Sequence, residues 1–283
     1  MLTRLFRIYK RIRQNNYIIN LKQRNRNKTM EETMNKITKD EKKYWGARAE
    51  KYNNLNWVNK NNTLEDMLMF AGDTNGKRVL DLGTGTGKVL SLFKKHNPCG
   101  IYYGIDISDE MTSLIDKSLG FNIQTCAMED MNIFQDNYFD VVTARMCMHH
   151  ADDIEKAFYE VKRVLKPNGI FIICEGTPPD RHSVDFYTNM FKYKEDRHTF
   201  LLDDLTNHYI KAGYNNILSK TTVLEKMSLN NWIDNGGTPE ENKKIIRELH
   251  YNAPDHVKKA YLMEEKDNDI FMNWKFVVVC GSK

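Results

Sequence analysis

Short apolar runs and amphipathic stretches alternate along the middle of the chain. Apolar runs at 77–82, 101–106, 121–126, 136–145 and 165–175 have the composition of buried strands. The stretches between them, including 86–96, 108–118 and 152–166, repeat apolar residues at the three- to four-residue spacing of a helix. This alternation predicts a parallel sheet with helices on both of its faces.

The pattern changes after residue 176. A helix at 200–213, a strand at 216–225 and a final strand at 271–280 complete the predicted sheet. About 45 residues separate the last two strands, and within them 228–265 look helical, with breaks at glycine and proline. We therefore expect an α/β fold: a doubly wound, mostly parallel seven-stranded sheet with a helical insertion near the C-terminus.

The charge of the chain is unevenly distributed. The formal net charge is +4, but residues 1–30 contain nine Lys and Arg and no acid, so 31–283 carry a net charge of −5. We expect 1–33 to be an unstructured basic extension and 34–283 to be the folded domain. A transit peptide or surface-binding helix is the alternative for this extension, although its lack of serine counts against a transit peptide. A mildly acidic body does not favour nucleic-acid binding.

Composition narrows the cellular setting. No apolar run approaches the ~18 residues of a membrane-spanning helix. The cysteines, at 99, 126, 147, 174 and 280, form no C-x-x-C pair and mostly lie in apolar runs. They are expected to be buried, reduced thiols. The sequence thus indicates a cytoplasmic protein, or an organelle-matrix protein if 1–30 are a transit peptide.

One stretch, from Val79 to Lys88, carries the strongest chemical signal. A short apolar run containing Asp81 leads into glycines at 83, 85 and 87, and helical spacing follows. Strand, glycine turn and helix together form a nucleotide cradle at the edge of a parallel sheet. The spacing is G-x-G-x-G, and an acid two residues before it would repel a pyrophosphate but suits a cationic group. Asp106, 25 residues after Asp81, can accept both hydroxyls of a ribose.

These features describe S-adenosylmethionine better than NAD. The segment Asp81-Leu-Gly-Thr-Gly-Thr-Gly87, with Gly104-Ile-Asp106-Ile-Ser downstream, resembles the class I, Rossmann-like S-adenosylmethionine-dependent methyltransferases. Asp136-Asn-Tyr-Phe-Asp140 and Leu165-Lys-Pro-Asn-Gly169 are typical of the same family. Together the motifs cover a cofactor-binding core at 77–176. Within the family, the chain resembles the group that includes the ubiquinone and menaquinone C-methyltransferases.

The resemblance implies a set of cofactor-binding residues. It places Met128 and Glu129 against the adenine, and it places Tyr44 and Tyr52 in a segment that covers the cofactor, although these aromatics could instead pack on the sheet. Arg145 leaves the carboxyl end of the fourth strand. The full expected set is Tyr44, Tyr52, Asp81, Gly83, Thr84, Gly85, Gly87, Asp106, Ile107, Met111, Met128, Glu129 and Arg145.

Methyl transfer to oxygen, nitrogen or carbon can require a base. His149 and His150 follow the fourth strand at the carboxyl edge of the sheet and are the candidate catalytic residues, with Glu175 a similar candidate. Alternatively, one histidine packs and the other is solvated. His250 and His256 are expected at the surface. A zinc site that combines His149 and His150 with His182 lacks ligand spacing, so no metal is expected.

The acceptor is expected to bind segments 177–200 and 228–265, whose aromatics Tyr187, Phe191, Tyr193 and Trp232 could enclose an apolar molecule. The alternative is that these segments form a helical cap or the surface of a homodimer. The sequence thus predicts a methyltransferase that uses S-adenosyl-L-methionine and acts on a small-molecule or lipid-like acceptor. An NAD-dependent oxidoreductase and a non-catalytic cofactor-binding module are the alternatives, and the glycine spacing and the two acids count against them.

Overall fold

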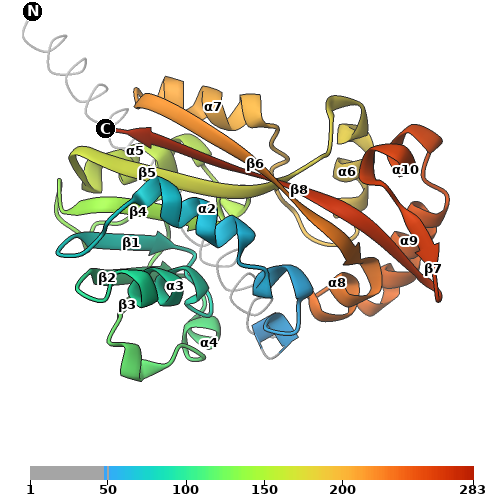
Figure 1. Ribbon diagram of the computed structural model, residues 1–283, viewed down its shortest axis with the longest axis horizontal. Coiled ribbons are helices and arrows are strands. Elements are labelled where there is room, and N and C mark those ends of the chain that lie inside the picture. Colours follow the sequence, from blue (N-terminus) through green and yellow to red (C-terminus); the bar gives the residue numbers. More distant parts are fainter. Residues whose placement is uncertain (1–47, 50) are drawn as a thin grey trace, which may run out of the picture. The chain divides into compact units, whose positions relative to one another are not determined.

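The strands form one sheet in the order β3-β2-β1-β4-β5-β8-β6, and the short β7 pairs with β8 (Figure 1). The computed structural model describes residues 48–49 and 51–283, so the expected basic extension and Tyr44 lie outside the described residues. The strands are β1 (Arg78–Leu82), β2 (Ile101–Asp106), β3 (Asn122–Thr125), β4 (Phe139–Arg145), β5 (Leu165–Thr177), β6 (Asn215–Ser228), β7 (Glu264–Lys266) and β8 (Asp269–Ser282).

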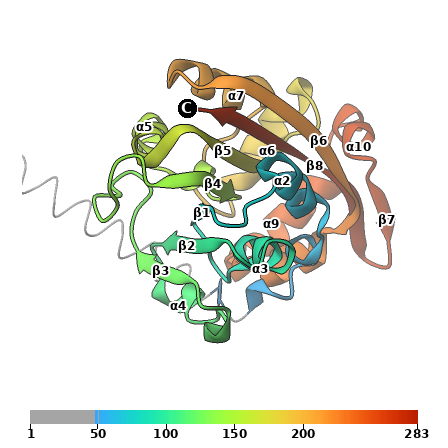
Figure 2. The ribbon, with the colours of Figure 1, turned by 60° about the vertical axis from the view of Figure 1, so that its left-hand side comes forward.

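The pairing confirms the expected doubly wound, mostly parallel sheet. Strands β1 to β5 pair in parallel, whereas β8 runs antiparallel to both β5 and β6. Figure 2 shows the strands following one another across the sheet from β6 to β3. The carboxyl ends of the parallel strands therefore lie along one edge, which is where open sheets of this kind bind ligands.

Helices cover both faces of the sheet. Val141 packs with α2 (Asn62–Ala71) and α3 (Lys88–His96) on one face, whereas its neighbour Val142 packs with α5 (Ile154–Val164) and α7 (Leu202–Lys211) on the other. This follows from the period of two in a strand, which sends successive apolar side chains to opposite faces. A short 3₁₀ helix, η1 (Asn56–Asn59), precedes α2.

The expected helix at 108–118 is interrupted. It consists of α4 (Asp109–Thr112) and a separate 3₁₀ helix, η2 (Lys117–Leu119). The Asp116 side chain accepts a hydrogen bond from the Ser118 N–H and begins η2, and Gly120, at φ 68°, ends it. A local side-chain hydrogen bond thus overrides the apolar spacing.

The C-terminal insertion and the segment after β5 form a second layer of helices beyond the sheet. We call α6 (Val184–Phe191), α8 (Leu229–Asn235), α9 (Glu240–Tyr251) and α10 (Asp255–Tyr261) the cap. Two further 3₁₀ helices, η3 (Met148–His150) and η4 (Arg181–Ser183), precede α5 and α6. The cap helices pack around their own apolar cluster with the first part of β8, at the end of the long strands β6 and β8 (Figure 1).

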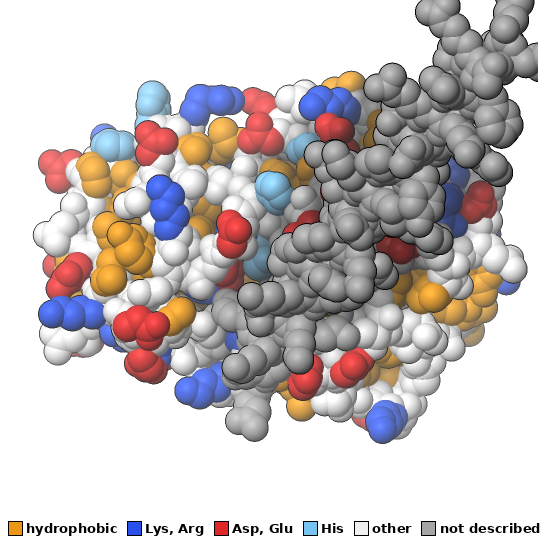
Figure 3. Space-filling view, turned by 180° about the vertical axis from the view of Figure 1, so that it is seen from behind, with side chains coloured by type: hydrophobic (Ala, Val, Ile, Leu, Met, Phe, Trp, Pro, Cys, Tyr) orange, Lys and Arg blue, Asp and Glu red, His pale blue; other side chains and the backbone are white. Residues whose placement is uncertain are grey.

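The outer surface is mixed in charge. Positive and negative side chains are interspersed on the face seen from behind (Figure 3). Within the described ranges, no helix is both long and apolar enough to cross a membrane. The expectation of buried thiols holds for Cys147, Cys174 and Cys280, but Cys99 is exposed, because it lies in the turn between α3 and β2, and Cys126 is half-buried.

Candidate active site

The loop between β1 and α3, Gly83–Gly87, has the tight geometry that its glycines predict. Gly83, Gly85 and Gly87 have φ values of 54°, 50° and 75°, in the region that disfavours side chains. A Cβ atom on Gly83 would lie 2.5 Å from the Cβ of Cys147. The Thr84 N–H donates to the Ile105 carbonyl at 2.9 Å and ties the loop to β2. This glycine loop leaves backbone close to any molecule bound at the edge of the sheet.

Asp106 ends β2 beside the glycine loop, as the sequence predicted. Its Oδ2 accepts a hydrogen bond from the Gly85 N–H at 2.8 Å, and its Oδ1 accepts one from the Ser108 N–H at 2.9 Å. Burial raises the pKa of this carboxyl, and these hydrogen bonds oppose the shift. Each oxygen has a further lone pair, so the carboxylate can also accept two hydroxyl groups.

Asp81 lies deeper, with only 1% of its surface exposed. The Thr143 hydroxyl on β4 donates to Asp81 Oδ1 at 2.7 Å. Burial raises the pKa of Asp81 to about 7, although the Thr143 hydrogen bond and the Arg145 guanidinium favour ionisation. The charge of Asp81 at neutral pH therefore depends on the groups around it, and a cation bound nearby would ionise it fully.

Other expected cofactor residues surround these acids. Met111 is buried on α4, and its Cε lies 3.3 Å from where a Cβ on Gly85 would be. Ile107 and Met128 are half-buried. The Glu129 carboxylate is also half-buried and accepts a hydrogen bond from the Asp152 N–H at 2.9 Å. These contacts place Met111 beside the glycine loop and fix Glu129 near the start of α5.

Arg145 and Tyr52 meet at Trp57 of η1. The Arg145 guanidinium lies 5.1 Å from the centre of the Trp57 ring and donates to the Trp57 carbonyl at 3.4 Å. Tyr52 packs edge-on against the same ring at 6.0 Å, and burial raises its pKa. Both residues are thus held by packing near the edge of the sheet, so the cofactor and packing interpretations of Tyr52 are compatible.

An apolar chamber opens beyond the carboxyl ends of β4 and β5, between the sheet and the cap. Its lining is mainly apolar, and it is partly open to solvent. Tyr187, Phe191 and Trp232, which the sequence singled out, line it, whereas Tyr193 is not among the lining residues. Its aromatic wall includes Trp57, Tyr187, Phe191, Trp232, Trp274 and Phe276.

Met146 marks the junction between the sheet edge and the chamber. Its φ of 56° is unusual for a residue with a side chain, and such backbone strain is concentrated at functional sites. The Gly176 N–H donates to the Met146 sulfur at 3.1 Å, which holds the side chain in the chamber wall. No feature of the sequence distinguishes this methionine from its neighbours in the strand.

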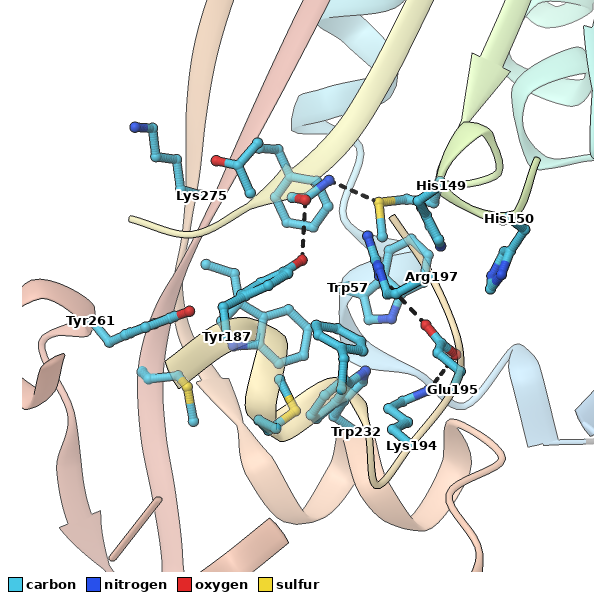
Figure 4. Close-up of a pocket in the computed structure, with 18 of the residues that line it drawn as sticks. Trp57, His149, His150, Tyr187, Lys194, Glu195, Arg197, Trp232, Tyr261 and Lys275 are labelled. Atoms are coloured by element: carbon cyan, nitrogen blue, oxygen red, sulfur yellow. Dashed lines mark hydrogen bonds and ion pairs between the residues drawn. The ribbon is translucent and has the colours of Figure 1, made fainter. Parts of the chain in front are cut away.

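His149 lies in this wall (Figure 4), and it forms a buried pair with Glu175. His149 Nδ1 lies 2.6 Å from Glu175 Oε2, and the side chains are 3% and 0% exposed. Burial holds the pKa of His149 well below its usual range and raises that of Glu175 to about 7. A neutral imidazole that donates through Nδ1 keeps a lone pair on Nε2, which is the form required of a base.

His150 lines the same wall. Its ring centre is 4.2 Å from that of His149, and burial holds its pKa well below the usual range. Ligand atoms of His149, His150 and Glu195 lie within 4.8 Å of one another, but His182, considered for a zinc site, is exposed elsewhere. The cations around this group disfavour a metal ion.

Those cations belong to a cluster that sequence reasoning missed. Glu195 Oε2 lies 3.1 Å from Arg48 and 2.9 Å from Lys194, and Glu195 Oε1 lies 3.4 Å from Arg197. Burial lowers the pKa of Lys194 to about 7. Although burial opposes ionisation, Lys194 and Arg48 hold the pKa of Glu195 well below its usual range. A Lys-Glu-Asp-Arg run normally indicates a solvated surface, so its pattern gives no sign of this burial.

His250 does not lie where the sequence predicted. It was expected at the surface but is 2% exposed and lines the chamber from the cap, whereas His256 is exposed as expected. His250 Nδ1 donates to the Ile246 carbonyl at 2.7 Å, and burial lowers its pKa to about 4. Burial keeps the imidazole neutral, and the hydrogen bond to the preceding helical turn satisfies its N–H group, so burying this residue is inexpensive.

Comparison with known proteins agrees with this arrangement. A family described as a methyltransferase domain matches residues 80–173. A methyltransferase of Bacillus subtilis, YcgJ, is 28% identical over 203 residues, which are 68% of this chain and 78% of YcgJ. The crystal structure of YcgJ covers 79% of this chain and 99% of its own, with a TM-score of 0.68 and 24% identity.

Two further proteins are similar to this chain, one in sequence and one in fold. The ubiquinone/menaquinone biosynthesis C-methyltransferase UbiE of Desulfotalea psychrophila is 34% identical over 127 residues, 44% of this chain and about half (51%) of that enzyme. A Haemonchus contortus phosphoethanolamine N-methyltransferase in complex with S-adenosyl-L-methionine has the same fold, with a TM-score of 0.53 and 19% identity over 81% of this chain and 56% of that one. These matches identify a methyltransferase domain at residues 80–173, and the chain is similar in sequence and fold to class I, Rossmann-like S-adenosylmethionine-dependent methyltransferases, including the ubiquinone and menaquinone group.

Proposed function

We propose that this enzyme methylates a flat, apolar small-molecule or lipid-like acceptor that binds in the chamber. One observation carries the proposal: the His149–Glu175 pair faces an aromatic chamber at the same sheet edge that carries the glycine loop and Asp106. The names of the ubiquinone/menaquinone relatives point to quinone biosynthesis, and a ring of that kind suits the aromatic wall.

Each proposed cofactor residue is assigned to one part of S-adenosylmethionine. Asp106, fixed by two backbone N–H groups, accepts the ribose hydroxyls, and the glycine loop leaves room for the cofactor because a Cβ at Gly83 or Gly85 would meet a neighbour within 3.5 Å. Asp81 favours the cationic amino group. Met111 and Met128 pack near the adenine, and Glu129 accepts from its amino group, in keeping with the set expected from the sequence.

The chain has three tasks in the reaction. When bound, S-adenosylmethionine would supply the methyl group from its sulfonium to the nucleophilic atom of the acceptor, and S-adenosylhomocysteine would leave. The aromatic wall holds the acceptor in line and excludes water. His149 Nε2 takes the proton that the acceptor loses, and Glu175 holds the ring through Nδ1 and stabilises the charge that forms. His150 contacts the acceptor beside His149.

The test measures cofactor binding and acceptor turnover separately. Calorimetry should show binding of S-adenosylhomocysteine and no binding of NAD; NAD binding alone would overturn the proposal. A screen of metabolite extracts with methyl-labelled cofactor then identifies the acceptor. With that acceptor, Trp232→Ala should raise KM or abolish turnover while cofactor affinity stays within about twofold, because Trp232 lines the chamber from the cap helix α8.

The alternative role for the cap as a dimer surface predicts a different result. In that case Trp232→Ala would change the oligomeric state in size-exclusion chromatography and leave turnover per subunit unchanged. Loss of cofactor affinity in this variant would instead mean that the cap supports the cofactor site, and the acceptor would have to be sought nearer Tyr52.

A further inference from the structure

Arg197 occupies the most unusual position in the chamber wall. Its side chain is 2% exposed, and its guanidinium lies 3.8 Å from Glu175 and 3.4 Å from Glu195; Figure 4 shows it beside Glu195. The guanidinium is 4.4 Å from the centre of the Phe191 ring, so an aromatic face supports it. Packing and ion pairs together hold this cation in one place at the reacting end of the chamber.

One nitrogen of Arg197 has no hydrogen-bond partner among the described residues. NH1 lies 3.4 Å from Glu195, but NH2 is buried and lies 3.8 Å from Glu175 Oε2, too far for a hydrogen bond. A buried N–H group without an acceptor is costly, because it has lost its water and gained nothing in return. An oxygen atom of a bound ligand would satisfy it.

The charges around the chamber also favour an anion. Among the described lining residues, Arg48, Lys194 and Arg197 stand against Glu195 and the adjoining Glu175 at the reacting end. Lys275 adds a further cation at the opposite end of the chamber (Figure 4). Among these described residues, cationic side chains outnumber carboxylates, and the wall is apolar, so charges interact more strongly here than in water.

The position of Arg197 relates this anion to the chemistry. His149 Nδ1 and Arg197 NH2 both approach the same atom, Glu175 Oε2, at 2.6 and 3.8 Å. A ligand oxygen bound to Arg197 therefore lies beside the proposed base.

We infer that the acceptor carries an acidic oxygen, as in an aromatic or enolic acid, and that Arg197 binds this oxygen next to the reacting atom. The inference rests on the proposed function, because it assigns the substrate class of the same chamber. Arg197 is then a specificity-determining residue that selects ionised acceptors over neutral ones of the same shape. An Arg suits this task because its planar fork can keep Glu195 on one nitrogen and bind the ligand with another.

The experiment uses a matched pair of probes on the full chain loaded with S-adenosylhomocysteine. 2-Naphthoate and methyl 2-naphthoate share a flat apolar ring and differ in charge. Calorimetry should show that the wild type binds 2-naphthoate at least about tenfold more tightly than the ester, as expected for a charge-assisted hydrogen bond. Equal affinity, or no binding of 2-naphthoate, would overturn the inference.

Variants then assign the preference to Arg197. Arg197→Met should abolish the preference for 2-naphthoate over its ester and leave the affinity for the ester unchanged within about twofold. Arg197→Lys, which keeps the charge, should retain part of this preference. Arg181→Met is the control, because Arg181 is 73% exposed on η4 and pairs with Asp203. An equal loss of both probes in Arg197→Met and Arg197→Lys would mean a structural role and contradict the inference.

Different results would contradict the proposed function and the inference of an acidic acceptor. Loss of S-adenosylhomocysteine binding in the wild type contradicts the proposed function itself. Retained binding of that compound with no preference between the probes contradicts only the acidic acceptor. If Arg197→Met does not fold, Arg197→Lys and the wild-type preference still decide the outcome.

Discussion

The proposed active site has two halves, one for the cofactor and one for the acceptor, and they are built in different ways. The cofactor half consists mainly of backbone: the glycine loop and the N–H groups that hold Asp106 come from one short stretch and the next strand. The acceptor half consists of side chains from distant segments, such as Arg48, His149, Glu175 and Arg197. A backbone site depends on local geometry, whereas the acceptor half depends on the whole fold. Substitutions should therefore affect the two halves differently.

The largest effect should follow removal of the proposed base. His149→Gln should lower kcat by roughly 10²–10⁴-fold, because proton transfer by a positioned imidazole contributes that much. Cofactor affinity should stay within about twofold, as measured by calorimetry alongside turnover of the labelled methyl group. His256→Gln, at an exposed position, is the control. An unchanged kcat would show that the acceptor needs no base, and a loss of cofactor affinity would remove the distinction between the halves.

The glycine loop should tolerate no side chain. Gly83→Ala forces a Cβ to within 2.5 Å of the Cβ of Cys147 at a φ of 54°. Strain and overpacking together should cost roughly 2–5 kcal/mol of the free energy of unfolding. Gly120→Ala is a matched control, since its φ is 68° with no atom within 4 Å, and should cost about 1–2 kcal/mol. Denaturant unfolding of both variants measures the difference, and equal costs would mean that the loop can relax.

Asp106 tests the polar part of the cofactor half. Asp106→Ala should weaken S-adenosylhomocysteine binding by about ten- to a hundredfold, the effect of losing charge-assisted hydrogen bonds to the ribose. Asp116→Ala is the control, because Asp116 Oδ1 also accepts from the N–H two residues later, at 2.9 Å, but Asp116 lies just before η2. If both variants bind equally well, the ribose lies elsewhere.

Asp81 should make cofactor binding depend on pH. Its pKa is raised to about 7 and the ionised form pairs with the cofactor's amino group, so apparent affinity should rise about tenfold from pH 6 to pH 8. Calorimetry across this range should show the rise in the wild type and a flat profile in Asp81→Asn. A persistent slope in the variant would assign the titration to another group, such as Glu175 or Lys194.

The raised pKa of Asp81 also determines how the stability of the folded state depends on pH. The pKa of Asp81 in the folded state is raised above its model value of 3.8. The folded state therefore binds this proton more strongly than the unfolded state does. This contribution to stability is fully present below about pH 4 and is lost as the pH rises through about 7. At pH 8, without cofactor, Asp81→Asn should unfold at a higher denaturant concentration than the wild type.

The sequence predicted most of the fold because its signals are local. Apolar runs predicted seven of the strands, and glycine spacing predicted the cradle next to β1. The short β7, whose residues are charged and exposed, was not predicted. The boundary errors have local causes that periodicity does not include: Asp116 begins η2 and divides an expected helix. Strand β6 continues to Ser228, beyond the predicted end at 225, because β8 remains beside it as a partner there.

The acceptor half was less accessible to sequence reasoning. His149 could be placed at the sheet edge because it directly follows a strand. The burial of Lys194 and Glu195 could not be predicted, because charged residues are buried only when partners distant in the chain interact with them. Here Arg48 pairs with Glu195, and the Gly236 carbonyl accepts a hydrogen bond from Lys194. His250 was assigned to the surface for the same reason: its burial depends on how the cap helices pack.

The strands β6 and β8 have a mechanical consequence. Each is 14 residues long, and their pairing runs from Asn215 opposite Ser282 to Ser228 opposite Phe271, so one ladder joins the sheet to the cap. A hinge that swings the cap away would have to break that ladder. We therefore expect amide hydrogens of the cap end of β8 to exchange as slowly as those of its sheet end, and acceptors to enter through side-chain and loop movements at the rim.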